Sequence, residues 1–247
     1  MKNHFANLIS DILFRFGFDV RCYSEHLGAN PFDVMQELVK NPSVIFDVGA
    51  NDGRTAIKFS NRFPKTKIES FEPGNEVFGA LEKSIKRYKG TIIPHKLAFG
   101  DSVGVKELYM HRESGNDSLL PDSSQIGDFS ASKPCDLIGK SEVEVTTIDS
   151  WCEKSGISYI DILKMDTQGY EMHILDGAKG MLEQSQIGLI YTEVLFVPLY
   201  EGQGYFDDIV VFLNKYGYKL YGLYGIHSDK KHGVNFADAL FVPKGNN

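Results

Sequence analysis

Short apolar segments alternate with segments of helical length from Ser43 to the end of the chain. Apolar strands separated by helices of about 10–15 residues are typical of right-handed βαβ units, which build a parallel sheet covered on both faces. The pattern therefore predicts an α/β fold. The expected strands are 44–48, 68–71, 91–98, 143–147, 160–165, 188–192, 218–221 and 239–242, and the expected helices are 55–63, 76–88, 149–154, 171–182 and 206–216.

Two other stretches depart from this alternation. Residues 103–111 predict an extra strand, and residues 114–140, rich in Ser, Asp, Gly and Pro, predict a long loop. Before the alternation, an apolar stripe at 5–16 predicts an amphipathic helix, and Asn30-Pro31 and Asn41-Pro42 predict the start and end of a second helix. We therefore expect a helical extension at 1–42 and one domain at 43–247. The extension packs on its own domain or, alternatively, forms a homodimer.

The 247-residue chain carries 33 acidic and 26 basic residues, a formal net charge of −7. Binding to nucleic acid without sequence specificity depends on neutralising phosphates, so this balance disfavours a nucleic-acid partner. No apolar run reaches the roughly 20 residues of a transmembrane segment, and the N-terminus lacks a secretory signal. Three widely spaced cysteines without a Cys-x-x-Cys pair favour a reducing compartment. We expect a cytoplasmic protein.

The loop after the first strand, Asp47-Val-Gly49-Ala-Asn-Asp-Gly53, is the most informative segment. Glycines between a strand and a helix let the backbone turn tightly and approach a ligand near the unpaired N–H groups of the helix start. The spacing is neither Gly-x-Gly-x-x-Gly nor a Gly-Lys-Ser/Thr phosphate loop. Asp47 and Asp52 would repel a pyrophosphate and favour a cationic ligand.

Glu72 ends the next expected strand, 19 residues after Gly53. In open α/β sheets, an acidic residue about 20 residues past the glycine loop hydrogen-bonds a ribose diol. A ribose joined to a cationic group without a phosphate describes S-adenosylmethionine, so the sequence predicts this cofactor. The alternative is that the glycines serve only to form a turn and that Glu72 is only a turn residue before Pro73.

Several segments together resemble the FkbM family of S-adenosylmethionine-dependent methyltransferases. They are Asp47–Gly53, Phe71-Glu72-Pro73, 97–101 (Leu-Ala-Phe-Gly-Asp), 145–149 (Val-Thr-Thr-Ile-Asp) and 164–171 (Lys-Met-Asp-Thr-Gln-Gly-Tyr-Glu). The resemblance implies a class I methyltransferase (Rossmann-like) fold, with a mostly parallel seven-stranded sheet whose last strand is antiparallel. It also implies an O-methyltransferase acting on a sugar hydroxyl in a glycan, a nucleotide-linked sugar or a glycosylated natural product.

The resemblance further implies a cofactor site at the carboxyl ends of the first strands. Gly49 and Gly53 would approach the methionine part, Glu72 the ribose hydroxyls, and the Ala98–Asp101 turn the adenine. The expected cofactor-binding residues are Asp47, Gly49, Asn51, Gly53, Glu72, Pro73, Ala98, Asp101 and Asp166.

A sugar hydroxyl is a poor nucleophile, so methyl transfer needs a positioned base as well as an in-line arrangement. Asp166 follows the strand expected beside the first one, where ligands bind in open α/β sheets. It is predicted to accept the hydroxyl proton or to hold the sulfonium end of the cofactor. Glu193, at the end of the neighbouring strand, is the second catalytic candidate, and His111 is the third because imidazole titrates near neutral pH. Asp47, Asp52, Glu72, Asp166 and Glu193 are expected to line one acidic crevice.

Asn116, Glu171 and Tyr200 are expected to contact the acceptor, a small molecule or a glycan. Glu171 has the alternative of capping its helix, and Tyr200 that of packing in the core. A divalent metal held by Asp166, Glu193 and a histidine is an alternative that we do not expect. The competing functions are a nucleotide-linked dehydrogenase, a methyltransferase-like module without turnover, and a methyltransferase acting on a non-sugar small molecule.

Overall fold

The computed structural model describes residues 30–88, 90–125 and 137–245, so the predicted helix at 5–16 lies outside the described residues. The helices are α2 (Pro31–Leu38), α3 (Arg54–Arg62), α4 (Asn75–Ser84), α5 (Ile148–Ser155), α6 (Glu171–Asp176), α7 (Lys179–Glu183) and α8 (Phe206–Lys215). The strands are β1 (Val44–Val48), β2 (Lys67–Phe71), β3 (Ile92–His95), β4 (Ala98–Phe99), β5 (Gly104–His111), β6 (Leu137–Thr146), β7 (Ile160–Met165), β8 (Ile187–Leu195), β9 (Tyr218–Asp229) and β10 (Gly233–Pro243).

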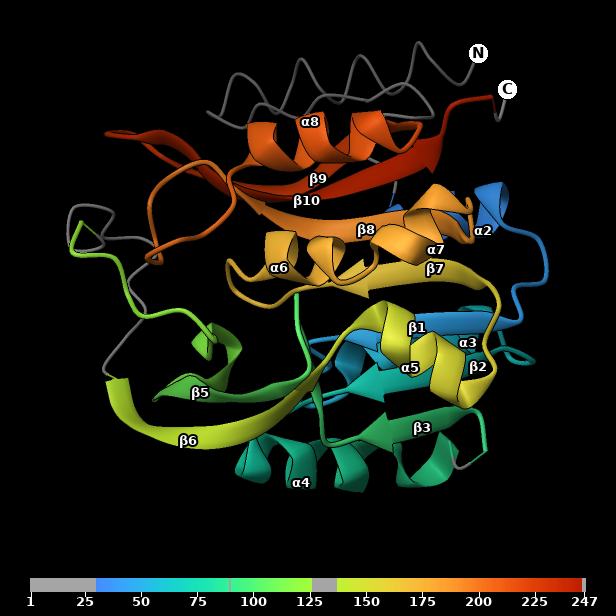
Figure 1. Cartoon of the computed structure of the whole chain (residues 1–247), viewed down its shortest axis with the longest axis horizontal. Helices are drawn as coiled ribbons and strands as arrows, with labels where there is room; N and C mark the ends of the chain where they lie inside the picture. The colour runs from blue at the N-terminus through green and yellow to red at the C-terminus, as the bar shows by residue number, and fades with distance from the viewer. Residues whose placement is uncertain (1–29, 89, 126–136, 246–247) are drawn as a thin grey trace, which may run out of the picture.

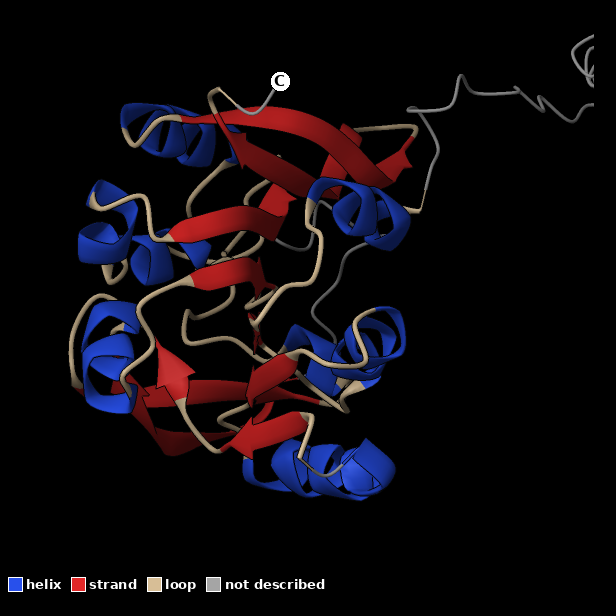
Figure 2. Ribbon diagram, turned by 90° about the vertical axis from the view of Figure 1, so that its right-hand side faces the viewer, coloured by secondary structure: helices blue, strands red, loops and turns tan. Residues whose placement is uncertain are grey.

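Seven of these strands form one sheet in the order β3-β2-β1-β7-β8-β10-β9. The pairs from β3 to β8 are parallel, whereas β10 runs antiparallel to both β8 and β9. Helices cover both faces of the sheet (Figures 1 and 2). The predicted α/β fold, with a mostly parallel seven-stranded sheet and an antiparallel last strand, is confirmed.

The chain changes direction across the sheet between β1 and β7. From β1 it proceeds outward through β2 and β3, and from β7 it proceeds to the other side through β8. The carboxyl ends of β1 and β7 therefore flank the position where ligands bind in open α/β sheets.

Apolar layers pack on both faces of the sheet. On one face, Phe46, Leu163 and Ile190 belong to a cluster that includes residues of α5 to α8. On the other face, Ile45 and Ile162 belong to a cluster under α2, α3 and α4. Successive residues of a strand point to opposite faces, so β1 and β7 are apolar on both sides, as central parallel strands are. Charged residues within these two strands are therefore exceptional.

A smaller sheet, in the order β4-β6-β5, lies beside the main one (Figure 1). The predicted strand at 103–111 is confirmed as β5, but the loop predicted at 114–140 is too long, because β6 begins at Leu137. The first part of β6 is mostly exposed, including its apolar residues Leu137 and Ile138, and the two buried residues of the strand are Val143 and Val145. This part lacks the apolar alternation that would have revealed it as a strand.

The helix predicted at 171–182 is two helices, α6 and α7, separated around Gly177. Gly177 approaches Gly100 so closely that a Cβ atom would lie 2.0 Å from the Gly100 carbonyl oxygen. The Asp149 carboxylate accepts hydrogen bonds from the N–H groups of Gly180 (2.8 Å) and Met181 (3.0 Å). These bonds satisfy N–H groups in the first turn of α7 and so stabilise the start of this helix.

The last two strands are longer than predicted and form a long hairpin, β9 and β10. Many residues of β9 are exposed. The strand therefore shows little of the apolar alternation from which its full length could have been predicted.

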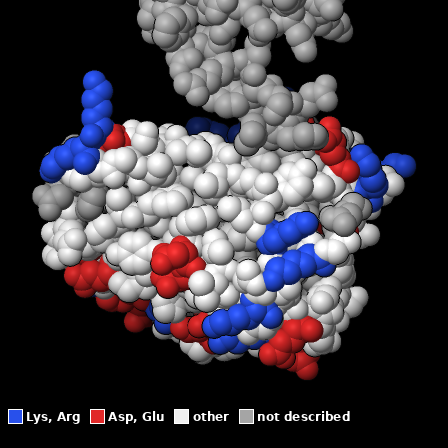
Figure 3. Space-filling model, turned by 90° about the horizontal axis from the view of Figure 1, so that it is seen from above, with Lys and Arg blue, Asp and Glu red and all other residues white. Residues whose placement is uncertain are grey.

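None of the helices in the described part of the chain is both long and apolar enough to cross a membrane. On the face shown in Figure 3, Lys and Arg side chains are interspersed with Asp and Glu, and much of the face carries neither.

Candidate active site

The ends of β1 and β7 come together at Gly49. Its φ is +70°, and a Cβ atom would lie 1.9 Å from the carbonyl oxygen of Asp166. Only glycine combines this backbone conformation with so close an approach. The N–H groups of Gly49 and Ala50 both donate to the carbonyl oxygen of Phe71 at 3.0 Å, which ties the loop to the end of β2.

A buried ion pair joins β1 and β7 beneath this loop. Lys164 Nζ lies 3.0 Å from Asp47 Oδ1 and donates hydrogen bonds to the carbonyl oxygens of Gly49 (2.8 Å) and Val48 (3.3 Å). Burial alone would lower the pKa of Lys164, but the charges of Asp47 and Asp166 outweigh it and raise that pKa. The lysine therefore stays charged and fastens the two strand ends together.

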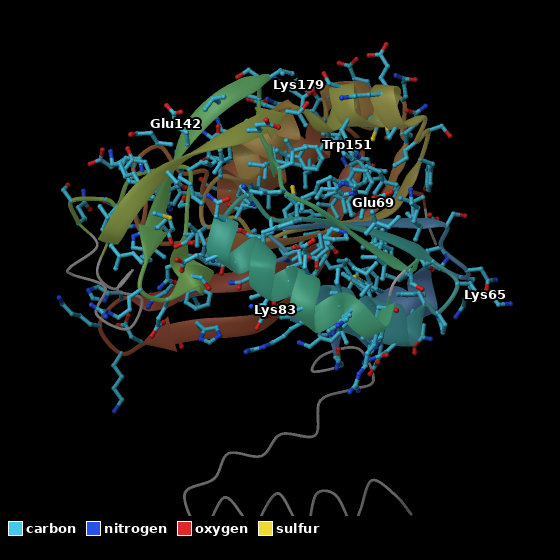
Figure 4. All side chains as sticks on the ribbon, turned by 90° about the horizontal axis from the view of Figure 1, so that it is seen from below. Lys65, Glu69, Lys83, Glu142, Trp151 and Lys179 are labelled. Carbon is cyan, nitrogen blue, oxygen red and sulfur yellow. The ribbon has the colours of Figure 1, made fainter. Side chains whose placement is uncertain are left out.

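The first cavity lies over the ends of β1, β2 and β7 and has a volume of about 100 Å³. Its walls combine apolar side chains with a few polar groups. The lining residues include Val48, Gly49, Asn51, Phe71, Glu72, Pro73, Leu97, Ala98, Phe99, Leu108, Leu119, Asp166, Thr167 and Gln168. The Phe71 and Phe99 ring centroids are 4.5 Å apart, and Trp151 of α5, labelled in Figure 4, packs edge-on against Phe71.

Glu72 is the buried acid of the first cavity. Its Oε2 accepts a hydrogen bond from the N–H of Asn51 (3.0 Å), and its Oε1 accepts one from the N–H of Gly74 (2.9 Å). Burial raises the pKa of Glu72 to about 7, although both hydrogen bonds act to lower it. The carboxyl group is thus held in place and changes its charge near neutral pH.

The segment after β5 closes the first cavity, and we call residues 114–119 the roof. Backbone hydrogen bonds link Tyr109 and Ser118 in both directions, and Ser118 Oγ donates to the carbonyl oxygen of Gln168 (2.7 Å). His111 lies beside the roof: its N–H donates to Asp117 Oδ1 (2.6 Å), and its Nε2 lies 3.0 Å from Asp122 Oδ1. The His111 ring is fully buried and lines neither cavity.

Three acidic residues lie on adjacent strands at the end of the sheet. Asp238 of β10 is opposite Glu193 of β8, and Asp166 directly follows Met165, which pairs with Thr192. We call Asp166, Glu193 and Asp238 the acidic row. Burial, and then the charge of Asp166, raise the pKa of Glu193 well above its usual value.

Gln168 connects two members of the acidic row. Its Nε2 donates to Asp166 Oδ1 (3.0 Å) and to Glu193 Oε2 (2.9 Å), while its Oε1 accepts a hydrogen bond from the Tyr200 hydroxyl (2.8 Å). The amide therefore holds two carboxyl groups side by side.

A second cavity, of about 530 Å³, lies on the other side of Asp166. It is lined from α2, α3 and the strands β7 to β10. Its lining residues are Asn30, Pro31, Phe32, Thr55, Lys58, Arg62, Lys164, Met165, Asp166, Tyr191, Tyr224, Gly225 and Asp238. Asp166 is the one residue in the described part of the chain that lines both cavities.

The residues expected to bind the cofactor fall into two groups. Gly49, Asn51, Glu72, Pro73, Ala98 and Asp166 line the first cavity. Asp47 is sealed beneath it against Lys164. Gly53 begins α3, where a Cβ atom would press on Leu81 of α4 at 2.8 Å, so helix packing accounts for this glycine. The Asp101 carboxylate lies outside the cavity, 2.8 Å from His173 Nδ1.

The expected crevice with five acidic residues is wrong in part. Asp52 is at the surface, where its carboxylate pairs with Arg54 at 2.8 Å. Glu72 and Asp166 line the first cavity, and Glu193 lies behind Gln168. Hydrogen bonding within the loop and the strand ends, which a sequence does not show, separates these groups.

The residues expected to contact the acceptor line neither cavity. Glu171 is buried, and its Oε1 accepts hydrogen bonds from the N–H (2.7 Å) and the hydroxyl (2.9 Å) of Thr167. Tyr200 is buried and bonded to Gln168, and the carbonyl oxygen of Asn116 lies 3.4 Å from the Tyr200 hydroxyl. All three stabilise the loops around the acidic row.

Sequence reasoning missed several residues of the site. Lys164, Thr167 and Gln168 lie within the segment 164–171 that carried the resemblance, so a role for them could have been sought there. Tyr191, Tyr224 and Asp238 lie in strands without any motif, and only the sheet order brings them together. Within the described residues, no group of His, Cys, Asp or Glu is arranged to hold a metal ion.

The fold and the site define a class I methyltransferase. A solved structure of methyltransferase FkbM from Methylobacillus flagellatus KT has the same fold, with a TM-score of 0.51 and 15% identity; the match covers 82% of this chain and 43% of that one. The family model described as methyltransferase FkbM domain matches residues 47–220. The chain belongs to this family, which confirms the predicted resemblance and agrees with S-adenosylmethionine as the cofactor.

Curated relatives include a 2-O-methyltransferase and a hexuronic acid methyltransferase. The chain is 29% identical over 179 residues to the 2-O-methyltransferase NoeI of Sinorhizobium fredii, covering 69% of this chain and 70% of the relative. It is 25% identical over 161 residues to the hexuronic acid methyltransferase AglP of Haloferax volcanii, covering 65% of this chain and 59% of the relative.

Proposed function

We propose that this methyltransferase transfers a methyl group from S-adenosylmethionine to a hydroxyl group of a sugar. The observation that carries the proposal is the position of Asp166 between the two cavities. A donor in the first cavity and an acceptor in the second would meet at this carboxylate. The name of one relative, a hexuronic acid methyltransferase, supports a sugar as the acceptor, and the name of the other, a 2-O-methyltransferase, supports transfer to an oxygen.

The first cavity has the chemistry that a nucleoside requires. Glu72 presents a carboxyl group that suits a ribose diol, and the apolar walls around Phe71 and Phe99 suit a flat base. Asp166 places a negative charge where it would attract an ammonium or sulfonium group. When bound, S-adenosylmethionine supplies an electrophilic methyl group on a positively charged sulfur.

Asp166 is our candidate for the base that accepts the hydroxyl proton. Its side chain is 45% exposed and lines both cavities, and this position supports a role as the base. Glu193 is the neighbouring carboxyl group, held to Asp166 through Gln168. The raised pKa of Glu193 keeps it protonated to a higher pH than an ordinary carboxyl group, which lowers the repulsion that Asp166 experiences.

His111, the third catalytic candidate, serves in this proposal to position the roof. Its ring is bonded to Asp122 and its backbone N–H to Asp117, and both partners follow it closely in the chain. A base must come within hydrogen-bond reach of the proton that it removes. In this proposal, Asp166 would reach the proton of an acceptor bound in the second cavity.

Methyl transfer from labelled S-adenosylmethionine to a panel of methyl glycosides, uronic acids and non-sugar alcohols tests the proposal. We expect label on at least one sugar, and we expect Asp166→Asn to lower kcat, measured at saturating cofactor, by about 10²-fold or more. Asp207→Asn, at an exposed position in the first turn of α8, is the matched control. Full turnover in Asp166→Asn, or label only on non-sugar alcohols, would contradict the proposal.

A further inference from the structure

The second cavity contains three basic side chains, and two of them already have acidic partners. Lys164 is paired with Asp47 at 3.0 Å. Arg62 is paired with Asp33, with its NH2 group 2.7 Å from Asp33 Oδ1. Each of these cations is therefore neutralised within the protein.

Lys58 is different. It extends from α3, and among the described residues it forms no ion pair; its ammonium group instead lies over the Phe32 ring, 5.4 Å from the centroid. A lysine beside an aromatic ring at the wall of a cavity presents a positive charge to whatever enters. Among the described residues that line the cavity, Lys58 is thus the one cation without an acidic partner.

The opposite wall of the second cavity is suited to hydroxyl groups. The Tyr191 hydroxyl donates to Asp238 Oδ2 at 2.7 Å, which leaves Asp238 Oδ1 to accept another hydrogen bond. Tyr224, opposite Asp238 in the hairpin, adds an aromatic ring. Aromatic rings and a few oriented polar groups are what small-molecule sites use to hold an amphipathic ligand such as a sugar.

These groups come to the second cavity from different elements of the fold. Asp166 lies where the cavity adjoins the donor cavity, Asp238 and Tyr224 come from β10 and β9, and Lys58 comes from α3 (Figure 1). Both acidic groups repel an anion, so a negatively charged part of the ligand would turn toward Lys58. The hydroxyl groups would then face Asp166 and Asp238.

We propose that the second cavity is the acceptor site and that it selects a sugar bearing an anionic group, a carboxylate or a phosphate, which binds Lys58. This inference rests on the proposed function, since it names the class of sugar that the same site takes. Lys58 is in this view a specificity-determining residue, while Asp166 accepts the proton.

Binding measurements test this inference without turnover. The protein, saturated with S-adenosylhomocysteine, is titrated with methyl α-D-glucuronide, with α-D-glucose 1-phosphate and with neutral methyl α-D-glucoside. We expect at least one of the two acidic sugars to bind more tightly than the neutral one, and the better of them identifies carboxylate or phosphate as the anion. We expect Lys58→Ala to weaken that binding by about tenfold, because a hydrogen bond to a charged group is lost.

Lys83→Ala is the matched control, because Lys83 is an exposed lysine on α4 outside both cavities (Figure 4). Equal affinity for acidic and neutral sugars, or unchanged binding in Lys58→Ala, overturns the inference. Weaker binding of S-adenosylhomocysteine in Lys58→Ala also overturns it, because Lys58 would then hold the carboxylate of the cofactor. Each result is obtained without methyl transfer, so a failure of the inference is distinct from a failure of the proposed function.

Discussion

The two cavities that meet at Asp166 are built in different ways. The first is framed by the main chain: Gly49 in a left-handed conformation, the ends of β1 and β2, and a roof joined to β5 by backbone hydrogen bonds. The second is larger, and side chains from α2, α3 and the strands β7 to β10 supply its walls. Side chains can be exchanged without rebuilding a backbone. One fold can therefore keep the first cavity constant while the second changes.

Removing the positive charge of Lys164, which joins β7 to β1 through Asp47, is expected to have the largest effect on stability. Lys164→Met leaves Asp47 buried without its partner, which should lower the free energy of unfolding by about 3–5 kcal/mol. The double variant Asp47→Asn with Lys164→Met should recover part of this loss. Urea denaturation measures both values. Equal stability of the single and the double variant would show that the ion pair does not hold β1 and β7 together.

Gly49→Ala tests the backbone of the first cavity. The added Cβ would overlap the Asp166 carbonyl oxygen and occupy a left-handed conformation, so we expect a loss of about 3 kcal/mol in the free energy of unfolding. Gly156 has the same φ of +70°, but a Cβ atom there would have no neighbour within 4 Å. Gly156→Ala should therefore cost only about 1–2 kcal/mol. If both variants lose the same stability, the close approach of β1 and β7 is not what requires Gly49.

Glu72 affects the first cavity alone, and its effect depends on pH. Its pKa is raised from 4.5 to about 7 in the folded protein. Between these values the unfolded chain has released the proton while the folded protein retains it, so rising pH favours unfolding. Protonated Glu72 therefore adds at most about 3 kcal/mol to the free energy of unfolding below pH 4.5, and this contribution is lost as the pH rises to 7.

Urea denaturation at several pH values between 4.5 and 7.5 measures this loss. Glu72→Gln should flatten the pH dependence, whereas Glu82→Gln, at an exposed position on α4, should not. An unchanged slope in Glu72→Gln would contradict the raised pKa. The affinity for adenosine, which does not titrate in this range, should increase as Glu72 ionises.

The smallest effect is expected for Asp101, which lies outside both cavities. Its ion pair with His173 is partly exposed, and such pairs contribute about 0–1 kcal/mol. Asp101→Asn should leave the affinities for S-adenosylhomocysteine and for an acidic sugar unchanged in calorimetry. A loss of cofactor affinity without a loss of stability would show that Asp101 belongs to the first cavity.

The sequence identified more of the residues that line the first cavity than of those that line the second, and the reason is physical. Gly49 and Glu72 are recognisable because a backbone turn and a strand end require particular residues at fixed spacing. The same reasoning did not show that the carboxylates of Asp101 and Asp52 contact His173 and Arg54, because the direction of a surface carboxylate depends on its partners. Local spacing contains no information about such partners.

The fold was predictable where strands are apolar on both faces, as β1 and β7 are. The fold was harder to predict at β6 and β9, because most residues of these strands are exposed and do not alternate between apolar and polar. The break at Gly177 was also hard to predict, because it depends on contact with Gly100. Tyr224 and Asp238 could not be assigned to the site because β10 enters the sheet between β8 and β9. Sheet order is a property of the folded chain.

The amide of Gln168 has a further consequence for the chemistry. Its nitrogen gives its hydrogen bonds to Asp166 and Glu193, and its oxygen receives the one from Tyr200, so the three bonds form a chain with a single polarity. Reversing the amide would direct its oxygen at two carboxyl groups. The Tyr200 hydroxyl is consequently committed as a donor, and the acid–base work falls to the carboxyl groups at the far end of this chain.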